Sequence, residues 1–423
     1  MRRRIDPKIS SSREVDAVPT THSRARQPKE DTGLRGPAKR QIAAIEVLPT
    51  PAQRVASVDA MRGFSMFAIL GTDVLAKAIE QMLANGGWFL AALGAVIGTQ
   101  FTHAEWHGVN FYDLVFPLFI FVTGVAVVFS LPKLLEQEGR WAAHKRVLRR
   151  SVVLFVLGVI CYGGVANGWS EIRLGGVLQR IALCYLFASL LFLNVSLRGM
   201  VASFAALLIG YWALMTFVPV PGIGAGSFAP GANLANWIDA HYLPGRKWEG
   251  NWDPEGILTT LPAIGTCLLG VFAGLLLKNA KLEARQKSLW LIYAGVALLA
   301  SGLLWSLQFP INKYLWTSSF VLVAGGFAAI MLGAFHEIID VRGYKAWASA
   351  FMWVGASAIV LYVFNVIFGF HVIAQRLVGG DVERLADRLV SPGAGRFLVT
   401  LVALLIALAA ARFLYRRKIF LRV

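Results

Sequence analysis

Bilayer-length apolar runs recur along this chain from Ala60 to the C-terminus, and this recurrence constrains its fold more than any other feature. A helix rises about 1.5 Å per residue, so about 20 apolar residues cross the hydrocarbon core of a bilayer. The chain is 57% apolar and 15% charged, whereas a soluble domain carries about a quarter charged residues. These runs exclude a soluble protein with one hydrophobic tail, and their lack of alternation excludes an outer-membrane barrel. We therefore expect an all-α polytopic membrane protein.

About ten of these segments have the length of a transmembrane helix. A further run, Trp88 to Ile97, is too short to span a bilayer, so we expect a re-entrant or interfacial segment after the first helix. Residues 1–53 are polar and rich in Arg, Ser and Pro, and we expect a disordered, basic cytoplasmic tail before a membrane domain of residues 54–423. The expected helices cover residues 60–82, 111–134, 150–166, 176–197, 200–218, 257–278, 288–308, 316–336, 347–371 and 397–415.

The net charge of +17 at pH 7 indicates a bilayer as the partner. In a polytopic protein such an excess marks cytoplasmic loops and anionic lipid contact, whereas a nucleic-acid-binding protein concentrates it on one exposed face. The positive-inside rule places both termini in the cytoplasm, although the basic outer loop 372–396 disagrees with this orientation. The segments assigned to the cytoplasm carry Arg140, Lys145, Arg146, Arg149, Arg150, Arg198, Lys281, Arg285, Lys287, Arg342, Lys345, Arg416, Arg417, Lys418 and Arg422.

Ionisable residues in or beside membrane helices cost several kcal/mol unless they are paired or wetted, so each is a functional candidate. Asp59 and Arg62 lie three residues apart at the start of the first helix, which predicts an ion pair within that helix. Asp73 lies deeper in the same expected helix. It is either a site residue or the ion-pair partner of Lys77, four residues further on.

The densest polar cluster precedes the second expected helix, where His103, Glu105, Trp106 and His107 are followed by Asp113. Histidines at i and i+4 with the glutamate at i+2 lack the HExxH arrangement, so we expect no metal site. A neutral imidazole suits general-base or acyl-acceptor chemistry because it titrates near neutral pH, and Glu105 or Asp113 would orient its tautomer. The alternative is an interfacial belt of His and Trp. The three cysteines, which have no CxxC spacing, are interpreted as small core residues: Cys161, Cys184 and Cys267.

Polar residues also precede three later helices, those beginning at 176, 257 and 316. Each set alone fits a helix cap with a snorkelling cation. Under the assigned topology, however, these helices and the one beginning at 111 all run from outside to inside. We therefore expect their polar starts to gather at one outer face: His103, Arg180, Glu255 and Lys313.

In this order, the clusters resemble those of the heparan-alpha-glucosaminide N-acetyltransferase family of transmembrane acyltransferases, in its bacterial-type form. Six ordered motifs spread over residues 54–423 carry this resemblance, and together they are far more specific than any one of them. The matching segments are Arg54-Val-Ala-Ser-Val-Asp-Ala-Met-Arg-Gly63, His103-Ala-Glu-Trp-His-Gly108 with Asp113-Leu-Val-Phe-Pro-Leu-Phe-Ile-Phe-Val-Thr-Gly124, Gly176-Val-Leu-Gln-Arg180, Asp253-Pro-Glu-Gly-Ile-Leu258, Asn312-Lys-Tyr-Leu-Trp316 and Tyr415-Arg-Arg-Lys-Ile-Phe420.

The resemblance implies a multi-pass transferase in a bacterial inner membrane. Acetyl-CoA on the cytoplasmic side would supply an acetyl group to an amino sugar or glycan amine of the glucosamine type at the outer face. The family's catalytic histidine falls on His103 and its deep polar residue on Asp73, while Asp113 or Glu105 would orient the imidazole. His103 either removes a proton from the acceptor amine or itself takes the acetyl group. No metal is implied.

The donor and the acceptor are each assigned a set of contacts. Arg180 would bind either pyrophosphate or an anionic sugar substituent, and either Asn312 or Lys313 would stabilise the oxyanion. For acetyl-CoA we expect contacts from Gln179, Arg180, Asn312, Lys313 and Trp316. For the acceptor we expect contacts from Glu105, Trp106, His107, Asp253 and Glu255.

Two other classes of protein remain open. A transporter of amino sugars or cell-wall fragments would also carry broken helices and buried charges, although no inverted repeat is visible in the sequence. A structural membrane scaffold would leave the clustered His, Asp and Arg residues without a purpose. The small residues from Gly94 to Gly98 would allow close helix packing, including packing in a homo-oligomer.

Overall fold

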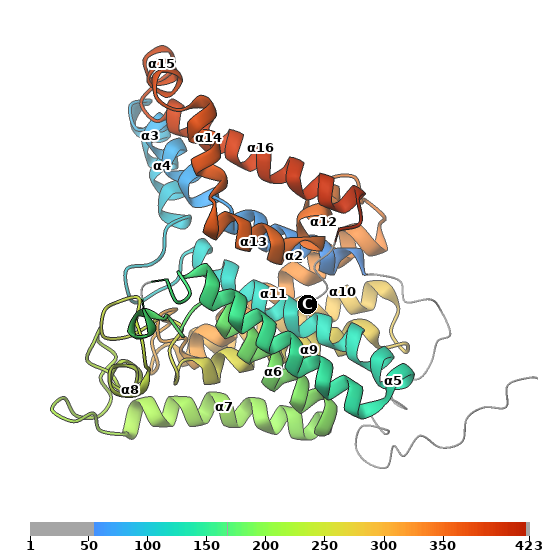
Figure 1. The fold of residues 1–423 in the computed structure, drawn as a ribbon. Helices are drawn as coiled ribbons and strands as arrows, with labels where there is room; N and C mark the ends of the chain where they lie inside the picture. Colours follow the sequence, from blue (N-terminus) through green and yellow to red (C-terminus); the bar gives the residue numbers. More distant parts are fainter. Residues whose placement is uncertain (1–54, 167, 420–423) are drawn as a thin grey trace, which may run out of the picture. The chain divides into compact units, whose positions relative to one another are not determined.

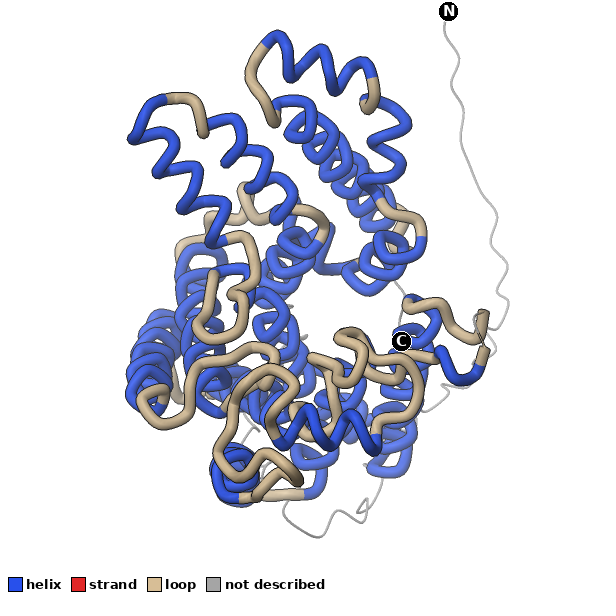
Figure 2. Tube along the Cα trace, turned by 90° about the vertical axis from the view of Figure 1, so that its left-hand side faces the viewer, coloured by secondary structure: helices blue, strands red, loops and turns tan. Residues whose placement is uncertain are grey.

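The computed structural model describes residues 55–166 and 168–419, so the predicted tail of residues 1–53 lies outside the described residues. The regular structure of the described part is helical, apart from two isolated bridges in the loop after α7, as Figure 2 shows. Its elements (Figure 1) are α2 (Ala56–Ile69), α3 (Thr72–Leu83), α4 (Gly87–Gln100), η1 (Phe111–Leu114), α5 (Val115–Cys161), η2 (Trp169–Glu171), α6 (Val177–Asn194), α7 (Leu197–Phe217), α8 (Leu234–Tyr242), α9 (Thr260–Lys278), α10 (Ala284–Trp305), α11 (Ser318–Phe335), η3 (His336–Val341), α12 (Ser349–Ala356), α13 (Ala358–Ile367), α14 (Phe370–Val378), α15 (Asp381–Leu389) and α16 (Ala394–Arg416).

The all-α membrane class is confirmed, but the expected number of ten spans is not. Among the described residues, seven helices are long and apolar enough to cross a membrane, or eight if α12 and α13, bent by 72°, form one span. The expected helix 60–82 is interrupted, because Gly71 has φ of 140° between α2 and α3. Two other expected helices, 111–134 and 150–166, fall mostly within the single element α5, which Gly139 interrupts at φ of 85°. Glycine adopts such positive φ values readily, whereas a residue with a side chain would be strained there.

The two parts of α5 run in opposite directions. His144, early in the second part, contacts Asn194 at the end of α6 with 3.3 Å between Nε2 and Oδ1. Gly158, near its end, lies against Gln179 at the start of α6. The second part of α5 therefore runs antiparallel to α6. As a result, the end of α5 and the start of α6 lie at the same end of the bundle.

Glycine pairs hold the central helices at close distance. A Cβ on Gly124 would lie 1.9 Å from the carbonyl oxygen of Cys267, and one on Gly270 would lie 1.9 Å from that of Phe121, so α5 and α9 touch through their backbones. Small residues permit such crossings in membrane helices. Gly98 of α4 likewise packs on Glu80 of α3, so the small residues of 94–98 serve packing within the chain.

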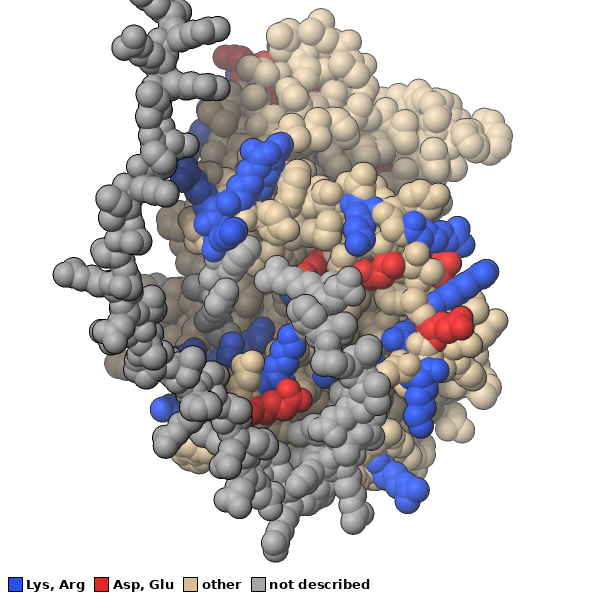
Figure 3. Space-filling model, turned by 90° about the vertical axis from the view of Figure 1, so that its right-hand side faces the viewer, with Lys and Arg blue, Asp and Glu red and all other residues tan. Residues whose placement is uncertain are grey.

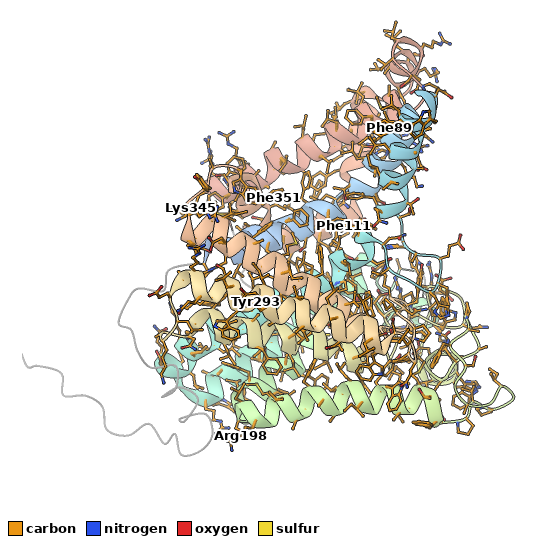
Figure 4. All side chains as sticks on the ribbon, turned by 180° about the vertical axis from the view of Figure 1, so that it is seen from behind. Phe89, Phe111, Arg198, Tyr293, Lys345 and Phe351 are labelled. Atoms are coloured by element: carbon orange, nitrogen blue, oxygen red, sulfur yellow. The ribbon has the colours of Figure 1, made fainter. Side chains whose placement is uncertain are left out.

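The described bundle has a loop-rich end and a basic end. We use "loop-rich end" for the end that carries the loops 101–110, 218–259 and 306–317, which Figure 2 faces. Figure 4 places Arg198 and Lys345 at the opposite end, the basic end. Figure 3 views the bundle from that side and shows many Lys and Arg side chains among fewer acidic ones. The three cysteines are all buried, as expected of core residues.

Candidate active site

Asp113 organises the loop that carries His103. The Asp113 carboxylate is 1% exposed and accepts backbone hydrogen bonds from Ala104 at 3.1 Å and Asn110 at 2.9 Å. Its Oδ1 lies 2.7 Å from His103 Nδ1. Because an ionised carboxylate only accepts, Nδ1 is the donor in this contact, and in the neutral form of the imidazole Nε2 then keeps its lone pair. The imidazole is thus held in the tautomer of a general base, and the His103 side chain remains 42% exposed.

Lys313 reaches the same imidazole from the loop between α10 and α11. Its Nζ lies 2.9 Å from His103 Nδ1, 3.0 Å from Nε2 and 3.6 Å from Asp113 Oδ1. The loop is fixed by Asn312, whose Oδ1 accepts the amide of Leu315 at 2.9 Å. Burial lowers the pKa of Lys313 below its usual value, although the Asp113 carboxylate partly opposes this shift.

Asp73 reaches His103 only through Tyr112. The Asp73 carboxylate lies near the Tyr112 hydroxyl, and the Tyr112 ring packs on the His103 imidazole at 4.9 Å between centroids. Lys77, the alternative partner of Asp73, instead binds Glu80 at 2.7 Å. The break at Gly71 places Asp73 in the first turn of α3, rather than in the middle of one continuous helix.

A buried ion pair braces the loop before α9. Arg173 is 4% exposed and binds Asp253 through two 2.8 Å contacts, and its Nη2 lies 3.0 Å from Glu255. Asp253 also accepts the amides of Trp248 and Glu255, so its oxygens are occupied within the loop. Burial alone would raise the pKa of Asp253, but Arg173 holds it below the usual value. Burial raises the pKa of Glu255.

Arg180 and Trp316 pack against each other beside the loop that precedes α9. The Arg180 guanidinium lies 4.8 Å from the centre of the Trp316 ring, and its Nη2 donates to the carbonyl of Pro254 at 2.8 Å and to the Thr259 hydroxyl. Trp316 is buried with φ of 49°, a backbone value that side chains seldom adopt and that often marks functional sites. Its indole donates to Thr266 at 3.1 Å.

Several buried polar atoms here have no hydrogen-bond partner among the described residues. They belong to side chains whose relative exposure is at most 1%: Arg180 Nε and Nη1, Gln179 Oε1 and Asn312 Nδ2. A buried polar atom without a partner is costly, and such atoms therefore require an explanation. The same three residues are among those the sequence assigned to the acetyl donor.

Aromatic side chains surround the approach to His103. Trp106 stacks on Tyr314 at 5.4 Å and 11° between planes, and Trp252 lies edge-on to Trp106 at 5.5 Å. The Trp106 indole donates to the carbonyl of Phe228 at 2.8 Å, which ties loop 101–110 to the loop after α7. Glu105 and His107, the other expected acceptor contacts in this loop, are exposed.

The expected convergence of polar helix starts is found in the structure. Lys313 contacts His103. Arg173 pairs with Glu255, and Arg180 donates to the neighbouring Pro254, so these polar helix starts lie at the same end of the bundle. Sequence reasoning missed Arg173, whose only signal was its isolation as the single basic residue of the segment 167–175. It also missed Tyr112 and the aromatic partners of Trp106, Trp252 and Tyr314, because nothing in their spacing reveals these long-range contacts.

Apolar helices with an oriented histidine and buried charges at one end define a polytopic membrane protein with a candidate acid–base site. Residues 54–220 match a family profile described as a domain of unknown function, DUF5009. The chain is 27% identical over 424 residues to the heparan-alpha-glucosaminide N-acetyltransferase of Homo sapiens, covering 85% of this chain and 59% of that protein. The enzyme of the same name from Mus musculus is 27% identical over 322 residues, or 62% of this chain and 48% of its own length.

The resemblance to this acetyltransferase family is therefore confirmed over most of the chain. The chain nevertheless spans less than two thirds of the length of these curated relatives. Among the described residues, no group of three or more His, Cys, Asp or Glu side chains is placed to hold a metal ion.

Proposed function

We propose that this protein transfers an acetyl group from acetyl-CoA to the amine of an amino sugar at its loop-rich end. The observation that carries the proposal is the His103–Asp113 pair, with 2.7 Å between Nδ1 and Oδ1, flanked by Lys313 at the end of an apolar bundle. A neutral imidazole with a free Nε2 can take a proton from an attacking amine. The named activity of the relatives is of the same class.

In the proposed reaction, the acceptor nitrogen attacks the thioester carbonyl carbon while His103 Nε2 takes a proton from that nitrogen. The carbon–sulfur bond then breaks, and the departing CoA thiolate takes the proton from the imidazolium. Lys313 Nζ, 3.0 Å from Nε2, or the unpartnered Asn312 Nδ2 would stabilise the oxyanion. In the alternative path, Nε2 attacks the thioester first, and an acetyl-histidine then passes the acetyl group to the amine.

The acetyl donor would extend through the bundle, with its nucleotide at the basic end. Its thioester arm would then reach the unpartnered atoms of Gln179, Arg180 and Asn312 beside Trp316. Arg180 lies at the loop-rich end, beside Pro254. We therefore assign it to the thioester end or to an anionic sugar substituent, rather than to pyrophosphate.

The acceptor would bind between the aromatic cluster and Glu255. Trp106 offers a flat face beside His103, while Glu105 and His107 are exposed enough to meet a sugar. Because Asp253 is saturated by Arg173 and two backbone amides, we assign it to orienting Glu255 rather than to direct contact. We further propose a bacterial inner membrane location with both termini in the cytoplasm, which makes the loop-rich end the outer face.

Release of CoA by the purified protein tests this proposal. We expect release from acetyl-CoA that requires glucosamine and is lost in His103→Ala. His241→Ala is the matched control, because His241 is an exposed histidine of α8 that bonds the carbonyl of Trp237 outside the site. If the kinetics are sequential and no acetyl-histidine can be trapped, the path through an acetyl-histidine intermediate is excluded. A folded protein that releases no CoA under any condition would contradict the proposal.

A transporter is the second candidate, because the bundle contains broken helices. The 72° bend between α12 and α13 and the break between α2 and α3 resemble the discontinuous helices of transport sites. Uptake of labelled glucosamine into vesicles without any CoA would favour transport. Thioester cleavage without such uptake would favour the transferase.

A further inference from the structure

The short helix α15 has an inverted amphipathic pattern. Its inward side is polar, because Asp387 Oδ1 accepts the amides of Gly393 at 3.0 Å and Gly395 at 2.8 Å at the start of α16. Its apolar side chains Leu385 and Leu389 are exposed, and Leu389 has a relative exposure of 75%. A helix on the surface of a soluble protein instead buries its apolar stripe and exposes its charges. The apolar stripe of α15 therefore requires an apolar environment outside the described residues.

The connection to α16 places α15 at a membrane surface. α16 is long and apolar enough to span a membrane, and only residues 390–393 separate it from α15. Near the other end of α16, Arg412 packs on Trp353 of α12 at 5.1 Å, and α12 follows Lys345 of the basic end. The start of α16, and α15 with it, thus lies toward the loop-rich end (Figure 1). α15 cannot itself span, since its nine residues measure about 14 Å and five of them are charged.

A second exposed apolar helix, α4, belongs to the same part of the molecule. It contains no charged residue, its 14 residues measure about 21 Å, and Trp88 at its start has a relative exposure of 84%. α4 packs on α3 through Gly98, and α3 packs on the turn before α16, where a Cβ on Gly393 would lie 2.8 Å from the carbonyl oxygen of Ala78. Figure 1 shows α3, α4 and α15 together beside the start of α16, and Figure 4 labels Phe89 of α4 there. Because α4 is also too short for a span, both helices expose apolar side chains at the same boundary of the membrane.

We propose that α4 and α15 form an interfacial lobe that lies in the headgroup region of the leaflet at the loop-rich end. The exposed side chains of α4 and the apolar stripe of α15, Leu385 and Leu389, would lie among the upper acyl chains. Arg388, which flanks this stripe, would lie level with the lipid phosphates. Such a depth is typical of amphipathic helices with basic flanks, and tryptophan is enriched there. This inference does not rest on the proposed acetyl transfer.

Charge favours lipid over a second copy of the chain as the partner of this lobe. Among the acidic residues of α15, Asp387 is bound to backbone amides and Asp381 to Arg384 at 2.5 Å. In a symmetric dimer the same exposed arginines would face one another, and like charges repel. Anionic headgroups instead attract arginines near the membrane surface. The exposed arginines of this segment are Arg376, Arg384, Arg388 and Arg396.

Spin labels on the lobe test this proposal in the intact protein, because the native cysteines are all buried. Leu385→Cys, Leu389→Cys and Val96→Cys would each be labelled and reconstituted into vesicles of phosphatidylcholine and phosphatidylglycerol. Ala225→Cys, exposed in the loop after α7, is the control in water. The measured quantities are the relaxation of each label by oxygen, which concentrates in acyl chains, and by a water-soluble nickel chelate.

We expect the labels at positions 385, 389 and 96 to lose most of the nickel relaxation shown at position 225 and to gain relaxation by oxygen. A label on Arg388→Cys should show an intermediate nickel relaxation, because this position lies at the edge of the stripe. All four side chains are exposed, so these substitutions should leave the fold intact.

Two results would overturn the proposal. Nickel relaxation at positions 385 and 389 equal to that at position 225 would place α15 in water. Labels shielded from both oxygen and nickel, with spin–spin broadening that disappears when unlabelled protein is added, would show that a second copy covers the stripe. Neither result depends on the release of CoA, so this inference and the proposed function fail separately.

Discussion

Tyr112 is the residue through which a distant carboxylate acts on the candidate base. Its hydroxyl lies near Asp73 and its ring packs on His103 at 4.9 Å, so Tyr112 limits the motion of the imidazole. Asp73 is thus a positioning residue in this account, and it does not touch the reacting atoms.

A double-mutant cycle tests this arrangement. Tyr112→Phe and Asp73→Ala should each lower kcat about five- to tenfold, the equivalent of one hydrogen bond, with little change in either KM. The double variant should be no slower than either single variant, because both remove the same interaction. Asp59→Asn, which alters an ion pair elsewhere in α2, is the control. Additive losses in the double variant would instead indicate that Asp73 acts independently of Tyr112.

At this scale the sequence offered candidate residues but not all of their partners. Both Asp113 and its alternative Glu105 lie close to His103 in the chain, and the contact that the structure shows is the one to Asp113. Arg173 and Asp253 are 80 residues apart, and no local pattern reveals that they pair. That pair is strong because the fold buries both side chains, and a sequence alone does not show which distant side chains the fold buries together.

At the scale of elements, the apolar segments predicted where helices lie better than where they break. Glycines within apolar runs are common in membrane helices, where most of them serve close packing, as Gly124 and Gly270 do. Gly71 and Gly139 instead take left-handed φ values of 140° and 85°. The sequence does not distinguish glycines that allow close packing from glycines that interrupt a helix, so it predicts residues 60–82 as one helix.

The short helix α8 should give the loops at the loop-rich end a pH-dependent stability. Asp239 is fully buried and accepts the amides of Ile257 at 2.9 Å and Asp253 at 3.4 Å, and burial raises its pKa to about 6. The folded state therefore binds a proton between about pH 4 and pH 6 that the unfolded state has lost. The free energy of unfolding should thus fall as the pH rises through this range.

Thermal unfolding in detergent measures this effect. The wild-type protein should unfold at a higher temperature near pH 5 than near pH 7.5, with Asp239 contributing about 1.4 kcal/mol to that difference. Asp239→Asn should lose that part of the difference, while the contribution of Glu255, whose pKa is also raised, remains. Asp253 does not interfere, because its lowered pKa moves its effect to more acidic conditions. Identical pH profiles for the two proteins would contradict this assignment.

At the scale of the whole molecule, the basic loops that the positive-inside rule assigns to the cytoplasm lie mostly at one end of the bundle, with one exception. Arg198 and Lys345 lie at the basic end in Figure 4, whereas the loops with the candidate site lie at the other end. The exception is the basic segment 372–396, which contains α15. Its charges are partly neutralised there, since Arg384 pairs with Asp381 at 2.5 Å.

Cysteine labelling tests this orientation. Ala225 in the loop after α7 and Lys281 before α10 are both exposed, and the native cysteines are all buried, so background labelling should be low. In intact spheroplasts, an impermeant maleimide should label Ala225→Cys but not Lys281→Cys. After permeabilisation it should label both. The reverse pattern in intact spheroplasts would place the loop-rich end in the cytoplasm.

Acetyl transfer across a bilayer tests the central claim most directly. The protein would be reconstituted into vesicles that contain glucosamine, with acetyl-CoA labelled in its acetyl group supplied outside. For molecules whose basic end faces outward, we expect labelled N-acetylglucosamine inside the vesicles, with stoichiometric CoA outside and neither product in His103→Ala. Glucosamine that leaves these vesicles unacetylated, with acetyl-CoA intact, would contradict the account and indicate a transporter.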